Sequence, residues 1–197
     1  MIMDDETYVP WNKKEVPESI YFHSTNPDDL KNSKKVKPRS KFHKKILVWQ
    51  VIDENENVSD PFICEGNISA TIYLEECIKK RLIPFIYIHY NRDDIIFWPD
   101  MATAHYAKIV KEYLIDAGVE FVDISRNPPN VPQARGIERF WALCKNRYSK
   151  ICKEPKNIRE LNIIWRNISN IVSRDSGKSV MESSLNRLRD IGFKGMI

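Results

Sequence analysis

Three carboxylates in separate parts of the sequence are candidates for one metal-binding cluster. Asp5 lies near the start, Asp100 ends the apolar run 95–99, and Glu138 follows Asp100 after 37 intervening residues. Folding can gather carboxylates from separate elements into a set of hard oxygen ligands, which Mg²⁺ and Mn²⁺ prefer to nitrogen or sulfur. Asp4 is the rival of Asp5, because alternation along a strand decides which of the two faces the cluster.

Such a cluster would suit phosphodiester chemistry. Two divalent ions about 3.5–4 Å apart activate an attacking water or hydroxyl and stabilise the leaving oxygen. Taken singly, an Asp at a strand end is usually a turn residue or a cap, and a lone Glu on a helix is usually solvated. The hypothesis therefore depends on the three residues together and on the elements that position them.

Alternating segments of strand and helix character could bring these residues together. The predicted strands are residues 1–9, 19–23, 45–52, 95–98 and 119–124. The predicted helices are residues 68–82, 104–117 and one that includes 137–148, followed from residue 155 by one or two helices that Gly177 separates. Pro84 is expected to kink or end its helix, so residues 85–90 fit either a strand or a helical continuation.

The connections between these elements predict a mixed α/β sheet. Short connections favour antiparallel pairing of the three opening strands, whereas helical crossovers favour parallel pairing of the later ones. Helices are expected on both faces of the sheet. We expect residues 1–150 to form the core and residues 151–197 to form a helical extension packed on it.

Charge is distributed unevenly along the 197 residues. The net charge of +4 combines −4 over residues 1–138 with +8 over residues 139–197. No apolar run approaches the roughly 20 residues of a membrane helix, and the N-terminus lacks the features of a signal peptide. We therefore predict an intracellular protein that does not engage a membrane. The four cysteines fit no zinc spacing and are expected to be reduced and mostly structural.

Basic residues offer candidate contacts to phosphates. Residues 31–45 hold eight Lys or Arg, a density typical of nucleic-acid contact or of a nuclear-import signal, although a solvated loop is the alternative. Arg135 and Arg139 flank Glu138 and could meet phosphates or be surface charges. His105 could contact nucleic acid or pack near a helix start. The candidate nucleic-acid-binding residues are Lys34, Lys35, Lys37, Arg39, Lys41, His105, Arg135 and Arg139.

Three local strings resemble the catalytic domain of Tc1/mariner-type DDE transposases. Asp5-Glu6 followed by Thr-Tyr-Val resembles the motif of the first strand. Residues 97–105 (FWPDMATAH) resemble the second motif, in which His follows Asp by a few residues. Residues 127–141 (NPPNVPQARGIERFW) resemble the third, a Pro/Asn-rich loop that leads to Ile-Glu and an aromatic residue. The resemblance spans about residues 1–150, and the third motif is its most specific part.

This resemblance implies a ribonuclease-H-like fold and cut-and-paste DNA transposition. Asp5, Asp100 and Glu138 would be the catalytic residues and would hold two Mg²⁺ or Mn²⁺ ions, with Asp5 bridging both. Cleavage would leave free 3′-hydroxyls that then attack target DNA. The implied partners are transposon ends and target DNA, and a homodimer is compatible with it. No organic cofactor is expected, and the implied location is the nucleus.

The sequence also departs from this family. Met101 stands where many relatives carry Asn, and Gly136 stands where Pro is usual, which predicts a less firmly set start for the helix that carries Glu138. Relatives carry paired helix-turn-helix domains ahead of the core, so we expect a fragment or a truncated copy. One rival interpretation is an inactive or domesticated remnant that binds nucleic acid or a partner. Another is a ribonuclease H or a further nuclease of the same fold.

Overall fold

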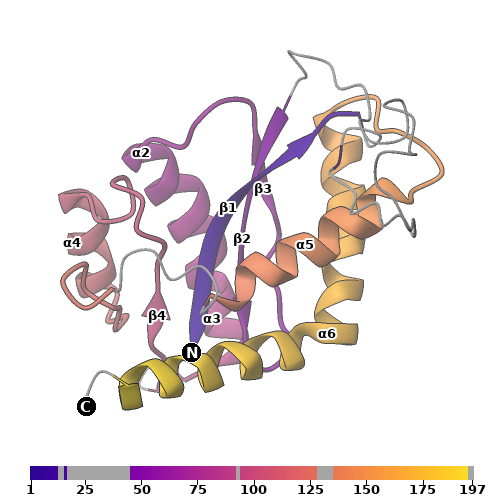
Figure 1. Ribbon diagram of the computed structural model, residues 1–197. Coiled ribbons are helices and arrows are strands. Elements are labelled where there is room, and N and C mark those ends of the chain that lie inside the picture. Colours follow the sequence, from indigo (N-terminus) through magenta and orange to yellow (C-terminus); the bar gives the residue numbers. More distant parts are fainter. Residues whose placement is uncertain (13–15, 17–44, 92–93, 128–134, 195–197) are drawn as a thin grey trace, which may run out of the picture.

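A four-stranded sheet lies between two layers of helices (Figure 1). The computed structural model describes residues 1–12, 16, 45–91, 94–127 and 135–194, with side chains as far as residue 187. The strands are β1 (Ile2–Pro10), β2 (Lys45–Asp53), β3 (Phe62–Cys64) and β4 (Phe97–Trp98). Their order is β3-β2-β1-β4; β1, β2 and β3 pair antiparallel, and β4 runs parallel to β1. The predicted mixed sheet is therefore confirmed.

The predicted strands differ from the observed ones in three places. Residues 19–23 lie outside the described part of the chain. The third antiparallel strand is β3, which is too short at three residues to show a pattern in the sequence. Residues 119–124 form no strand there beyond an isolated parallel bridge from Phe121 to Phe97.

Alternation along β1 and β2 builds two separate hydrophobic clusters. Met3, Ile46 and Val48 belong to the cluster that the C-terminal helices cover. Ile2, Leu47 and Trp49 belong to the cluster on the other face. Because neighbouring residues of a strand point to opposite faces, each polar residue of β1 is assigned to a face in the same way.

A continuous helical segment covers the second face. It consists of α2 (Ala70–Ile72), the π-helical η3 (Tyr73–Leu82) and α3 (Ile83–His89). The expectation that the helix ends at Pro84 is wrong, because α3 continues through it to His89. Of the two alternatives for residues 85–90, a strand or a helical continuation, the helical one is observed. Ile83 N–H donates to the carbonyl of Ile78, five residues back. The wider π turn moves aside the carbonyl with which a proline ring clashes in an α-helix.

Three further helices complete the two layers. They are α4 (Lys108–Asp116) beside the helical segment 70–89, and α5 (Gly136–Ser149) and α6 (Ile158–Lys194) on the opposite face (Figure 1). Glycine stops α4 as predicted, since Gly118 has a φ of +68°. None of the helices in the described ranges is long and apolar enough to cross a membrane.

Gly177 does not separate two helices, contrary to the prediction, and α6 runs through it. A Cβ at Gly177 would lie 3.2 Å from Cα of Glu56, and the Ser173 hydroxyl donates to the Glu56 carbonyl at 2.7 Å. Glycine at this position therefore permits the loop after β2 to lie against α6, rather than breaking the helix.

Candidate carboxylate site

Strand β1 places its two aspartates on opposite faces of the sheet. Asp5 faces α5, where Trp141 Nε1–H donates to its Oδ2 at 3.2 Å. Asp4 faces the helical segment 70–89, where its Oδ2 accepts from the Tyr73 hydroxyl at 2.6 Å and from Trp49 Nε1–H at 2.9 Å. Of the two aspartates, Asp5 is the one that faces the helix carrying Glu138, and its assignment to the site in place of Asp4 stays a prediction.

The other two carboxylates lie where β4 and α5 bring them toward Asp5. Asp100 follows β4, which pairs with the start of β1, and it is half-buried. Glu138 lies in the first turn of α5 and is exposed. Asp100 and Glu138 therefore come from two elements that flank β1, the strand that carries Asp5.

Electrostatics couples these three groups. Burial raises the pKa of Asp5 to about 8, and the carboxylate of Asp100 raises it too. The guanidinium of Arg135 offsets part of this rise, and Glu138 adds a further, smaller increase. Desolvation and like charge both favour the protonated form of Asp5. A carboxyl whose pKa is raised by burial and by nearby like charges is typical of functional sites.

The donor set fits a hard divalent cation by its chemistry. Three carboxylates supply only oxygen ligands, and their mutual repulsion is what a divalent cation would relieve. Among the described residues, however, no three His, Cys, Asp or Glu side chains already lie close enough together to hold an ion. Asp5 can interact electrostatically with Asp100 and Glu138 without a ready metal-binding group, because charges act over longer distances than those of metal coordination. In addition, both Asp5 oxygens accept hydrogen bonds from protein groups.

His105 is buried on the Asp4 face. Its Nε2 lies 3.1 Å from Glu6 Oε1, its Nδ1 lies 3.2 Å from the Asp100 carbonyl, and its ring stacks on Tyr73 with centroids 3.9 Å apart. Burial alone would lower the pKa of His105, but the carboxylates of Asp4 and Glu6 raise it above its ordinary value. This geometry is that of a buried histidine near a helix start, and DNA contact by His105 stays a prediction.

The basic candidates fall into three groups. Arg135 points its guanidinium at two backbone carbonyls, those of Asp4 at 2.5 Å and Pro99 at 3.2 Å. Arg139 is exposed on α5. The remaining candidates lie outside the described residues; they are Lys34, Lys35, Lys37, Arg39 and Lys41.

Residues that the sequence did not single out also shape the site. Lys145 lies on α5 close enough to interact with Glu138 and Asp5, and burial lowers its pKa. Its spacing of seven residues from Glu138 places both on one face of the helix, a signal that was present in the sequence. Trp141 was expected in the core and is buried there, but its indole N–H also holds Asp5.

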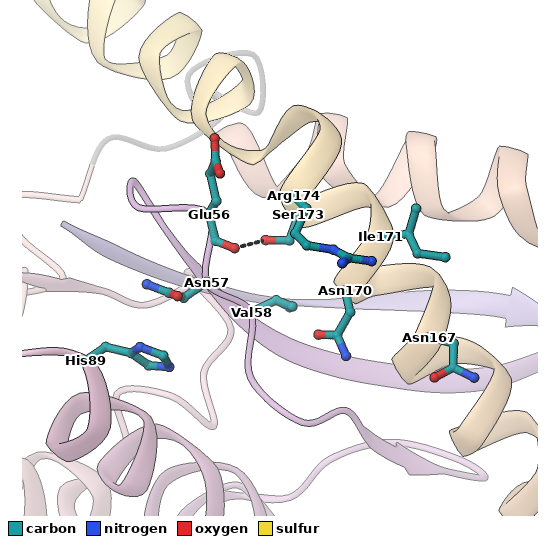
Figure 2. Close-up of a pocket in the computed structure, with 9 residues that line it drawn as sticks. All are labelled: Glu56, Asn57, Val58, His89, Asn167, Asn170, Ile171, Ser173 and Arg174. Atoms are coloured by element: carbon teal, nitrogen blue, oxygen red, sulfur yellow. Dashed lines mark hydrogen bonds between the residues drawn. The ribbon is translucent and has the colours of Figure 1, made fainter.

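The pocket in Figure 2 is separate from the carboxylates. It has a volume of about 700 Å³ and lies between the loop after β2, the end of α3 and α6. Its polar lining includes Asn57, His89, Asn167, Asn170 and Arg174. Asp5, Asp100 and Glu138 do not line it, so this pocket does not mark the candidate carboxylate site.

The mixed sheet and its two layers of helices define a ribonuclease-H-like fold. No protein-family model and no curated protein matches the sequence. Among solved structures, the chain is similar to the catalytic domain of Mos1 mariner transposase, with 14% identity and a TM-score of 0.50, covering 93% of this chain and 81% of that one. The predicted ribonuclease-H-like fold and the resemblance to mariner transposases are confirmed at the level of the fold.

Larger Mos1 assemblies match as well. A pre-cleavage Mos1 transpososome aligns with a TM-score of 0.58 at 13% identity, and a Mos1 paired-end complex with Mn with 0.59 at 14%. These alignments cover 93% and 91% of this chain. The chain spans only 55% of the length of the transposase chains in both complexes.

Proposed function

We propose that this chain is a DDE-type transposase catalytic domain that cleaves DNA phosphodiester bonds and transfers the resulting strands. The observation that supports the proposal most is that Arg135, at the start of the helix that carries Glu138, donates to the carbonyls directly before Asp5 and Asp100. After burial, the charges of Asp100 and Glu138 also contribute to the raised pKa of Asp5. The fold shared with Mos1 supports it. Mos1 structures with Mn and with Mg support the use of a divalent cation.

The residues of the chain have distinct roles in this proposal. Divalent ions, when bound, supply activation of the attacking oxygen and stabilisation of the leaving one. Asp5, Asp100 and Glu138 would hold these ions through oxygen donors. Trp141 would orient the Asp5 carboxylate through its indole N–H. No side chain needs to act as a covalent nucleophile, because water or a DNA 3′-hydroxyl attacks directly.

A nicking assay on supercoiled plasmid with Mg²⁺ or Mn²⁺ tests this function. We expect Asp5→Asn, Asp100→Asn and Glu138→Gln each to abolish nicking while the fold is retained. Asp116→Asn removes an exposed carboxylate from α4 and is the matched control. Retained nicking in any of the first three variants would remove that residue from the site.

A catalytically inactive remnant that binds nucleic acid is the second candidate. The observation that favours it is that the described side chains form no ready-made metal-binding group. Wild-type protein that binds DNA without nicking it would support the remnant. Cleavage of an RNA–DNA hybrid in preference to duplex DNA would instead point to a ribonuclease H.

Partners and location complete the proposal. DNA, both transposon ends and target, is the proposed partner, as in the Mos1 paired-end and strand-transfer complexes. A homodimer and a nuclear location are proposed with it. Gel filtration with multi-angle light scattering tests the first, and localisation of a fluorescent fusion tests the second.

A further inference from the structure

The parallel ladder between β1 and β4 ends immediately before the candidate aspartates. Its register contains two pairs, Ile2 with Phe97 and Met3 with Trp98. The backbone of Pro99 faces away from β1, because Phe97, two residues earlier, donates its N–H to the Glu120 carbonyl on the other side. The next N–H on the β1 side is that of Asp100, and it bonds to a side chain and not to a backbone carbonyl of β1. The backbone segments that carry Asp5 and Asp100 must therefore be held together by something other than strand pairing.

Beyond the end of the ladder, side chains form the hydrogen bonds that join the two backbone segments. Arg135 Nη2–H donates to the carbonyl of Asp4 at 2.5 Å, and its Nη1–H donates to the carbonyl of Pro99 at 3.2 Å. These carbonyls belong to the residues directly before Asp5 and Asp100. In addition, Asp100 N–H donates to Asp4 Oδ1 at 3.0 Å.

Arg135 is also tied to the third element. It is the N-cap residue of α5, and its carbonyl accepts from Glu138 N–H at 3.3 Å. Its guanidinium carbon lies 5.2 Å from the centroid of the Trp98 ring, which fixes the side chain from one side. Asn127 Nδ2–H donates to the same Pro99 carbonyl at 3.0 Å, so that acceptor is fully used.

We infer that Arg135 is a positioning residue that sets the spacing of Asp5, Asp100 and Glu138 by joining β1, the end of β4 and the start of α5. The inference rests on the proposed function of these carboxylates. It assigns Arg135 an inward role and not a phosphate contact. The planar guanidinium presents its two Nη donors to these carbonyls in fixed directions, a geometry that a lysine ammonium on its flexible stem does not reproduce.

Mn²⁺ affinity of the DNA-free protein, measured by electron paramagnetic resonance of the unbound ion, tests this role. We expect Arg135→Lys and Arg135→Gln each to weaken Mn²⁺ binding by about 10–100-fold, the range for residues that hold metal ligands in place. Arg126→Gln removes the same charge from an exposed position and should leave the affinity unchanged. Circular dichroism in EDTA verifies folding.

The outcomes separate the inference from the proposed function. Wild-type affinity in folded Arg135→Lys would overturn the positioning role, since the charge alone would then suffice, and would leave the function standing. If Arg135→Gln does not fold, Arg135→Lys decides, because it keeps the charge and the aliphatic stem against Trp98. Wild-type protein that binds Mn²⁺ but nicks no DNA would refute the function and leave the positioning role intact. Wild-type protein that binds no Mn²⁺ would overturn both.

Discussion

Replacing Asp5 by Asn should change how the stability of the protein depends on pH. The pKa of Asp5 is raised from 3.8 to about 8 in the folded chain, through burial and then Asp100. The folded state therefore binds this proton more tightly than the unfolded chain does. It follows that the contribution of Asp5 to the free energy of unfolding is highest below pH 4 and falls as the pH rises to about 8.

The size of this effect follows from the shift. At about 1.4 kcal/mol per pKa unit, the whole shift corresponds to roughly 5–6 kcal/mol, of which about 3–4 kcal/mol falls between pH 5 and pH 8. Asn cannot titrate, and its Nδ2 cannot accept the Trp141 hydrogen bond, which costs about 1 kcal/mol at every pH. We expect Asp5→Asn to match the wild type within about 1 kcal/mol at pH 5 and to exceed it by about 4 kcal/mol at pH 8.

Urea unfolding in EDTA, followed by tryptophan fluorescence at both pH values, measures this difference. Asp116→Asn is the control, because it removes an exposed carboxylate, and its difference from the wild type should not change with pH. Asp100→Asn should recover part of the lost stability at pH 8, since it removes the like charge next to Asp5. A difference between Asp5→Asn and the wild type that does not vary with pH would refute the reasoning that Asp5 is desolvated and crowded by carboxylates.

Three other predictions follow from contacts and linkage. Gly136→Ala should destabilise the protein by about 1–3 kcal/mol in the same urea assay, because its Cβ would lie 2.9 Å from Ser184 Oγ and 3.1 Å from the Val180 carbonyl. The double variant Gly136→Ala with Ser184→Ala should recover part of the lost stability. Full stability of the single variant would contradict the close packing of α6 on Gly136. His105→Ala should cost about 3–5 kcal/mol, as for the loss of other buried rings, because the ring stacks on Tyr73, and an unchanged urea midpoint would show that this packing contributes nothing. Mn²⁺ at a hundred times its dissociation constant should stabilise the wild type by about 2.7 kcal/mol and leave Asp5→Asn unaffected, whereas equal stabilisation of both would place the ion elsewhere.

Strand alternation and apolar patterning made much of the fold predictable. The run 45–52 is almost continuously apolar, and β2 is buried on both faces as that pattern predicts. The same period of two separates Asp4 from Asp5, so the sequence contained the information needed to place them on opposite faces, although it could not show which face α5 covers. The grouping of Asp5 with Asp100 and Glu138 required the family resemblance, since single carboxylates carry little signal.

Other features depended on contacts that no local pattern encodes. Pro84 remains inside a helix because a π-helical turn precedes it. Glycine fits at position 177 because the loop after β2 lies close to it, and at position 136 because α6 packs close to it. Local chain flexibility explains neither position. In particular, the expectation that Gly136 loosens the start of α5 did not consider that α6 packs directly on it. The inward orientation of Arg135 depends on two carbonyls more than 30 residues away in the sequence.

Anomalous diffraction from crystals of the wild-type protein grown with Mn²⁺ tests the central claim most directly. We expect anomalous peaks within coordinating distance, about 2.1 Å, of carboxylate oxygens of Asp5, Asp100 and Glu138. The absence of such a peak at millimolar Mn²⁺, or a peak on other side chains with these three carboxylates left apart, would contradict it.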